Sequence, residues 1–159
     1  MDDPKFYLLL QSKIQEQLDE VVQRAQKLAR DFDIAKEGSS EKSPFRNVLA
    51  VAIETGSIEV LKNFIRYQMG RQGSSPIWKE KRSGKVFAQA LIDQIDGLGD
   101  ILAKITADVT DAHGGEKERI SKAIHLTLSR LFLGYLAREH TALVAESLLK
   151  NSNRSSAGR

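Results

Sequence analysis

The sequence predicts an all-α protein, a compact bundle of about five helices with long antiparallel helix pairs. Apolar residues recur every three or four positions over long segments, which is the spacing of one helix face. The chain has three prolines and no segment with the alternation of a strand, so no strand is expected. Its 159 residues, 41% of them hydrophobic, can bury one core. We therefore expect a single helical domain over residues 1–150 and a polar, disordered tail at 151–159.

The first helix is expected over residues 5–35, because Asp3 can cap it and Pro4 suits its first turn. One face is apolar throughout, with side chains at steps of three or four: Leu10, Ile14, Leu18, Val21, Ala25, Leu28 and Phe32. Such a helix is roughly 45 Å long. A single domain needs this length as the spine of a bundle or as a partner surface.

Two shorter helices are expected next. After a loop at residues 38–42, Ser43 is the predicted cap of a nearly all-apolar helix that Gly56 ends in a left-handed conformation. Ser57 is the predicted cap of the next helix, which extends to about residue 69. Its expected inward side chains are Ile58, Leu61, Phe64, Ile65 and Met69. In the polar loop that follows, Trp78 either packs on the core or serves as a base-stacking platform or partner anchor.

Two long helices complete the predicted bundle. The fourth is expected over residues 85–108, capped by Ser83, and its glycines Gly97 and Gly99 allow a kink or a close helix approach. A turn at 111–115 leads to the fifth helix, expected over residues 116–150. There Gly134 is predicted to mark a tight helix crossing. Long helices of this kind are typical of antiparallel hairpins in a bundle.

Positive charge is concentrated in residues 57–85, which contain seven Lys or Arg and two Glu. The net charge of this stretch is +5, compared with +3 for the whole chain. A local basic patch is the electrostatic footprint of a polyanion, most often nucleic acid, and the alternative is a solvated surface loop. The candidate nucleic-acid-binding residues are Lys62, Arg66, Tyr67, Gln68, Arg71, Lys79, Lys81, Arg82 and Lys85.

The sequence offers no clear catalytic or metal site. It has no cysteine, and no two of its histidines, His113, His125 and His140, are paired at helical spacing. We expect His125 to be hydrogen-bonded in the core and His140 to lie at the surface. Three acids share a face of the fourth helix and are interpreted as a solvated or partner-facing stripe: Asp93, Asp96 and Asp100.

These features predict a protein that is not an enzyme and has no cofactor. The lack of cysteine is compatible with the reducing cytoplasm. No apolar run has the length of a signal peptide core or a membrane span, so a cytoplasmic protein without a membrane partner is expected.

The segment LKNFIRYQMGR, residues 61–71, resembles a motif in the small subunits of type III CRISPR effector complexes. In that family a helix with Leu-Lys, then Tyr-Gln-x-Gly-Arg, is followed by a polar, basic segment and further helices. The matching residues here are Leu61, Lys62, Tyr67, Gln68, Gly70 and Arg71. The resemblance implies a non-catalytic subunit of an antiviral ribonucleoprotein complex. Its implied partners are guide RNA, target RNA, the backbone and large subunits, and copies of itself that stack head to tail.

The candidate residues are chemically suited to that role. Lysine and arginine at one helix end and in the following loop can contact phosphates without reading sequence, and Tyr67 with Gln68 can add a stack or a sugar contact. We therefore predict RNA-backbone binding by a small subunit of a ribonucleoprotein. One alternative is a helical protein–protein interaction module without nucleic-acid binding, and another is a nuclease or other enzyme.

Overall fold

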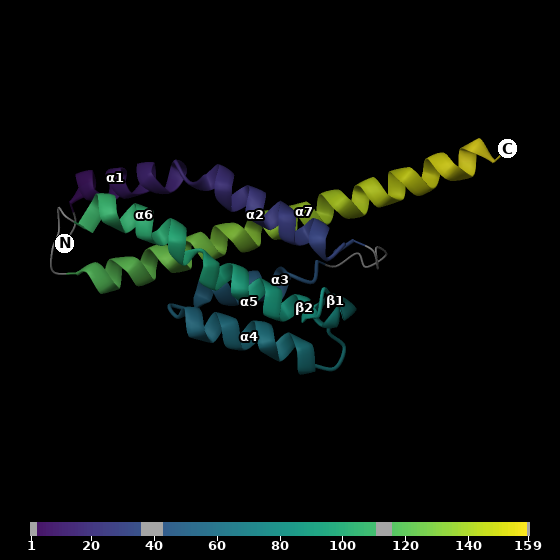
Figure 1. The fold of residues 1–159 in the computed structure, drawn as a ribbon, viewed down its shortest axis with the longest axis horizontal. Helices are drawn as coiled ribbons and strands as arrows, with labels where there is room; N and C mark the ends of the chain where they lie inside the picture. The colour runs from purple at the N-terminus through teal and green to yellow at the C-terminus, as the bar shows by residue number, and fades with distance from the viewer. Residues whose placement is uncertain (1–2, 36–42, 111–115, 159) are drawn as a thin grey trace.

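The computed structural model of the protein describes residues 3–35, 43–110 and 116–158 (Figure 1). Helices dominate this part of the chain, so the all-α prediction is confirmed. In chain order the elements are α1 (Pro4–Gln15), α2 (Leu18–Asp31), α3 (Arg46–Glu54), α4 (Ile58–Gly70), the 3-10 helix η1 (Pro76–Lys79), β1 (Lys81–Arg82), β2 (Lys85–Val86), α5 (Phe87–Gly97), α6 (Gly99–Thr110) and α7 (Lys117–Ala157). The loop predicted at 38–42 and the turn predicted at 111–115 lie outside the described residues.

The N-terminal helix begins as expected but is divided. Asp3 is its N-cap, and the Oδ1 atom of Asp3 accepts a hydrogen bond from the Lys5 N–H at 3.0 Å. The prediction of one helix over residues 5–35 is wrong, because the Gln17 N–H donates to the Ile14 carbonyl, three residues back instead of four. The division has a packing reason: α1 packs against α6, whereas α2 packs against α7.

Of the caps predicted for the next two helices, one is confirmed and one is wrong. Ser57 caps α4, since its Oγ accepts from the Val60 N–H at 3.3 Å. Ser43 does not cap α3; its Oγ accepts from the Phe45 N–H at 3.2 Å in the turn before that helix. Gly56 is not left-handed, because its φ is not positive, and Thr55 is the C-cap of α3.

The segment expected to be a loop contains regular structure. β1 and β2 form an antiparallel hairpin in which Lys81 pairs with Val86 and Arg82 with Lys85. Ser83 (φ 52°) and Gly84 (φ 78°) form its turn, and positive φ at both positions is typical of a type I′ hairpin. The prediction of no strand is therefore wrong, and Ser83 belongs to this turn instead of capping α5.

Trp78 in η1 belongs to the core. It is 1% exposed, and its ring lies 5.7 Å from the rings of both Phe45 and Phe87, measured between centroids. The interpretation of Trp78 as a core residue is confirmed. Its burial ties the segment between α4 and α5 to α3.

The glycines of the long helices have different roles. Leu98 separates α5 from α6 between Gly97 and Gly99, which confirms the predicted kink. A Cβ atom added at either glycine, or at Gly134, would meet no atom of a packed neighbour within 4 Å. The close helix approach and the tight crossing predicted at these glycines are therefore absent.

The helix α7 is the spine of the molecule. It contacts α2, α3, α4 and α6. Figure 1 shows that its C-terminal part extends beyond the other helices. The chain runs in opposite directions in α6 and α7, as expected for a hairpin, and in the same direction in α2 and α7. Because α7 continues to Ala157, the prediction of a disordered tail is wrong for residues 151–157.

A single cluster of buried apolar side chains joins these elements. On α4 it includes Leu61 and Ile65, both fully buried, whereas Phe64 is half-buried against its edge and is not the core residue expected. No helix among the described residues has both the length and the apolar character that crossing a membrane requires.

Candidate nucleic-acid interface

The helix α4 separates a buried face from a charged face. Leu61 and Ile65 are fully buried, whereas Arg66 is exposed and Tyr67 is 54% exposed. This division follows from helical spacing, since adjacent residues lie about 100° apart around the axis. Arg66 and Tyr67 are therefore accessible to a ligand, as the sequence predicted.

Gln68 does not share that face. It is 2% exposed, so its predicted place in a nucleic-acid interface does not agree with the structure. Its carbonyl accepts a hydrogen bond from the Ser74 hydroxyl at 2.7 Å, and the same hydroxyl lies 2.9 Å from the Arg71 carbonyl. Ser74 thus closes the turn that follows α4 and positions the backbone of Arg71.

Arg71 lies at the C-terminal end of α4 and is half-buried. Its backbone N–H donates to the Tyr67 carbonyl at 3.0 Å. In the described structure its Nε, like the Nε2 of Gln68, is buried without a hydrogen-bond partner. Because this Nε is buried, a phosphate from solvent could be bound only by the terminal nitrogens of the guanidinium.

Two of the candidate lysines are bound to carboxylates of α5. The Nζ of Lys62 lies 3.0 Å from Asp96 and 3.3 Å from Glu59. The hydrogen bond with Asp96 is the main cause that raises the pKa of Lys62. The Nζ of Lys85 lies 2.5 Å from Asp93, and this contact, with a hydrogen bond from Gln89, lowers the pKa of Asp93.

Arg82 is also paired, with the carboxylate of Glu80 two residues before it. Of the seven cations in residues 57–85, Lys62, Arg82 and Lys85 thus have acidic partners. Two of those partners, Asp93 and Asp96, lie outside the stretch, so its net charge of +5 overstates the positive charge of this surface.

Four cations remain without an ion pair in the described part of the chain: Arg66, Arg71, Lys79 and Lys81. We call them the unpaired cations. They lie in the C-terminal half of α4, in η1 and in the hairpin. Figure 1 shows these parts of the chain in one region of the molecule. Lys79 and Lys81 are exposed, like Arg66.

Arg66 lies between two shallow hollows. One, of about 470 Å³, is lined by Asn63, Phe64, Arg66, Tyr67 and Met69. The other, of about 580 Å³, includes Lys62, Asp96 and Gln89. The rings of Phe64 and Tyr67 lie 5.9 Å apart between centroids, and both line the first hollow together with Arg66. Such a pairing of ring and cation suits a nucleotide, whose base can stack and whose phosphate is anionic.

The acidic stripe on α5 and α6 pairs with cations of the chain itself. Besides Asp93 and Asp96, Asp100 binds Arg24 of α2 through two hydrogen bonds, at 2.9 Å and 2.6 Å. This bidentate contact lowers the pKa of Asp100. The three carboxylates lie at the solvent-exposed surface, as the solvated interpretation predicted, but their partners are cations of the chain itself. Arg24 is 76 residues away in sequence, so no local pattern could have indicated the pair.

No group of three metal-ligating side chains occurs within the described ranges. The Nε2 of His125 lies 2.8 Å from the Ile95 carbonyl, so the predicted hydrogen bond is present, but His125 is half-buried and is not the core residue expected. His140 is 8% exposed and its ring packs edge-on against Phe45 at 5.7 Å, so its predicted surface position is wrong. Burial lowers the pKa of His140. His113 lies outside the described residues.

No family model, curated protein or solved structure matches this chain.

Proposed function

We propose that this chain is a non-catalytic RNA-binding subunit of a type III CRISPR effector complex and acts in antiviral defence. The proposal rests on the motif resemblance in residues 61–71. The observation that supports RNA binding is the set of unpaired cations, Arg66, Arg71, Lys79 and Lys81. The first two lie within that motif. Cations without carboxylate partners are free to exchange their counterions for phosphates.

The contact is expected to be with the RNA backbone. The unpaired cations come from the C-terminal half of a helix, a 3-10 helix and a hairpin, and lysine and arginine in such positions can bind phosphates without reading base edges. Tyr67 adds an exposed ring on which a base can stack without sequence preference. Guide and target RNA are the proposed ligands, and the cytoplasm is the proposed compartment.

A titration tests this proposal. The full chain is mixed with a labelled single-stranded RNA and, separately, with an RNA duplex, at 50 and 200 mM salt. We expect weak binding with little sequence preference that falls steeply as salt rises, because phosphate contacts release counterions. If neither RNA binds at low salt, the proposal fails.

The absence of catalysis is tested separately. Labelled RNA incubated with the chain and Mg²⁺ is expected to stay intact. Cleavage by a preparation free of contaminating nucleases, if it disappears when one acidic residue is changed, would show that the chain is an enzyme.

The proposed assembly includes copies of the chain stacked along the RNA beside the backbone and large subunits. Contacts between different faces of identical chains do not close into a ring and build a filament. The number of bound copies, measured by analytical ultracentrifugation, should therefore rise with RNA length. One copy on every RNA, whatever its length, would argue against stacking.

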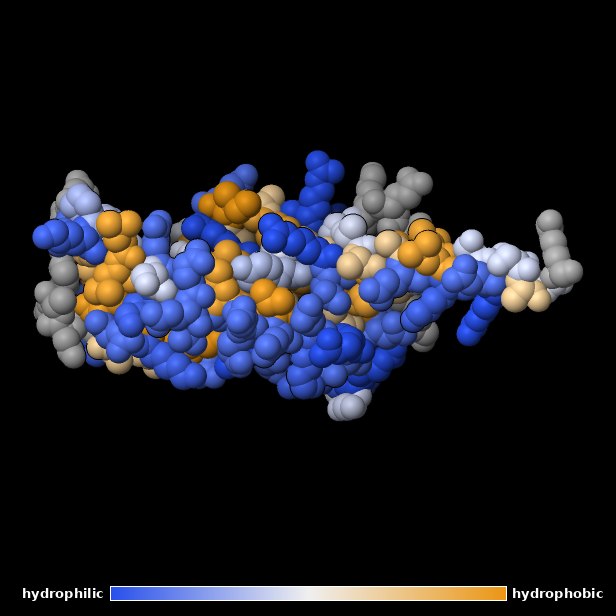
Figure 2. Space-filling view, turned by 90° about the horizontal axis from the view of Figure 1, so that it is seen from above, coloured by the Kyte–Doolittle hydropathy of each residue, from blue (hydrophilic) through white to orange (hydrophobic). Residues whose placement is uncertain are grey.

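A protein–protein interaction module is the second candidate function. Its support is the exposed apolar surface: Leu148 and Leu149 on the projecting part of α7 are 60% and 66% exposed. In Figure 2 hydrophobic patches interrupt a mainly hydrophilic face, including one on that projecting part. This candidate predicts no RNA binding at any salt concentration, so the same titration separates the two functions.

A further inference from the structure

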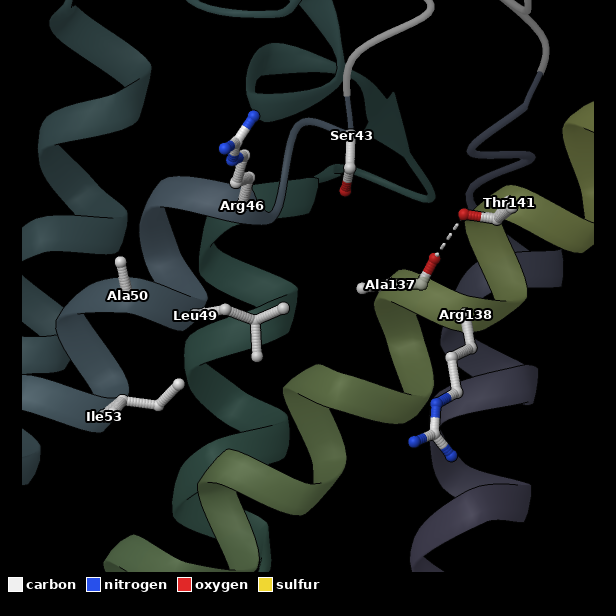
Figure 3. Close-up of a pocket in the computed structure, with 8 residues that line it drawn as sticks. All are labelled: Ser43, Arg46, Leu49, Ala50, Ile53, Ala137, Arg138 and Thr141. Carbon is white, nitrogen blue, oxygen red and sulfur yellow. Dashed lines mark hydrogen bonds between the residues drawn. The ribbon is translucent and has the colours of Figure 1, made fainter.

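An apolar groove lies between α3 and α7, and none of the unpaired cations lines it (Figure 3). Its volume is about 450 Å³. Figure 3 shows the side chain of Leu49 pointing from α3 toward α7, with Ala137 opposite. The lining residues are Ser43, Arg46, Leu49, Ala50, Ile53, Ala137, Arg138 and Thr141.

The groove has rigid walls. Arg130 of α7 holds the C-terminal end of α3: its Nε lies 2.5 Å from the Ala52 carbonyl, and its Nη2 lies 3.2 Å from the carbonyls of Ile53 and Thr55. On the other side of α3, Val48 and Ala52 are fully buried in the core. The groove therefore persists in the absence of a ligand.

The apolar lining is exposed to solvent. Ile53 is 66% exposed, and Leu49 is half-buried. Apolar side chains of another molecule could cover this lining, and the arginines at its rim could bind polar groups beside them. The occupant must supply apolar side chains, which the sugar–phosphate backbone of RNA lacks.

The charge around the groove is positive. Its described lining includes Arg46 and Arg138 and no carboxylate, and neither arginine has an ion pair in the described part of the chain. The guanidinium of Arg138 lies 5.8 Å from the centre of the Tyr135 ring. An occupant is therefore favoured if acidic residues flank its apolar face.

The chain's own exposed apolar segments do not meet that requirement. α1 carries Tyr7, Leu8 and Leu9, and its charged residues are both lysines, Lys5 and Lys13. The projecting part of α7 carries one acid, Glu146, near Leu148 and Leu149, and two bases, Lys150 and Arg154. Both segments are net positive, so charge disfavours a second copy as the occupant.

We propose that the groove between α3 and α7 binds a short amphipathic helix of a different protein, with an apolar stripe flanked by Asp or Glu. A helix is the form that fits, because it places apolar residues at i, i+3, i+4 and i+7 along a groove between two other helices. Leu49 and Ile53 contact the stripe, and Arg46 and Arg138 bind the flanking carboxylates. The site is independent of RNA binding.

The test uses three fluorescent synthetic peptides of equal length and anisotropy as the readout. The first has leucine at the stripe positions and glutamate beside them, the second has lysine in place of glutamate, and the third has serine in place of leucine. We expect the first to bind the full chain at least about tenfold more tightly than either control, because only it matches both the apolar surface and the charge. Equal binding of the first two peptides, or no binding of the first, overturns the proposal.

Variants locate the binding. Ile53→Asp should abolish it, and Ala50→Glu provides an independent variant at an exposed lining position if the first unfolds in a thermal melt. The double variant Arg46→Glu with Arg138→Glu should reverse the preference and favour the lysine peptide. Val60→Asp is the matched control, since Val60 is 51% exposed on α4 and does not line the groove.

Sedimentation velocity completes the test. The free chain should be a monomer, and Ile53→Asp should leave its mass unchanged. A dimer that Ile53→Asp dissociates would show that a second copy fills the groove and would overturn the proposal. Unchanged peptide binding by both Ile53→Asp and Ala50→Glu would also overturn it.

Discussion

Replacing Arg66 with alanine should weaken RNA binding and reduce its salt dependence without unfolding the chain. Arg66 is exposed and has no ion pair in the described structure, so its guanidinium is available to a phosphate. Exposed substitutions usually change stability by less than about 0.5 kcal/mol. The neighbouring Ile65 is fully buried, and Ile65→Ala should cost roughly 2–5 kcal/mol of unfolding free energy.

The magnitude follows from the number of unpaired cations. Each phosphate contact contributes a slope of about 0.7 to the plot of log affinity against log salt for single-stranded RNA. If Arg66, Arg71, Lys79 and Lys81 each bind one phosphate, the slope is about 2.8, and affinity falls about 50-fold between 50 and 200 mM salt. Removing one contact lowers the slope to about 2.1 and the loss to about 20-fold.

The assay is fluorescence anisotropy with labelled single-stranded RNA at four or more salt concentrations. The matched control is the double variant Lys62→Met with Asp96→Asn, which removes the ion pair at 3.0 Å between α4 and α5 and leaves the net charge unchanged. Its slope should equal that of the wild type. The reasoning is refuted if Arg66→Ala keeps the full slope, or if the control variant lowers it as much.

The remaining predictions concern stability and are read by thermal and chemical unfolding. Trp78→Ala should cost roughly 3–5 kcal/mol, because the ring is 1% exposed between two phenylalanines, whereas Tyr67→Ala should change stability little. Arg130→Ala should cost roughly 1.5–3 kcal/mol, since it leaves carbonyls at the end of α3 without a charged donor. Burial lowers the pKa of His140 in the folded chain, so the unfolded chain binds the proton more readily. Stability should therefore fall as pH drops below about 6.5, and His140→Leu should flatten this dependence.

Each of these has a contradicting result. A Trp78 variant as stable as the wild type would mean that η1 does not anchor the segment between α4 and α5. If Arg130→Ala and Arg130→Lys are both as stable as the wild type, the guanidinium does not hold α3. A pH profile that His140→Leu leaves unchanged would assign the pH dependence to other groups.

The sequence alone determined where most helices lie and which face of α2 and of α4 is buried. Those properties are local. Asp3 and Ser57 cap the helices that follow them, and Gly97 and Gly99 interrupt the long helix expected over residues 85–108. On α4, the spacing of apolar residues separates Ile65 from Arg66. The local concentration of lysine and arginine likewise identified a basic surface. Helical geometry then separated the exposed Arg66 and Tyr67 from the core, although Gln68 turned inward.

Only the tertiary structure decided which of those charges are free. Asp93 and Asp96 are brought to Lys85 and Lys62 by the packing of α5 beside the basic segment, and Asp100 binds Arg24 across 76 residues of sequence. The division of the first helix has the same origin, because α1 and α2 pack against different helices. Burial of Trp78 and His140 and the groove between α3 and α7 also arise from contacts between distant segments. Periodicity describes one element at a time, so it cannot report which elements meet.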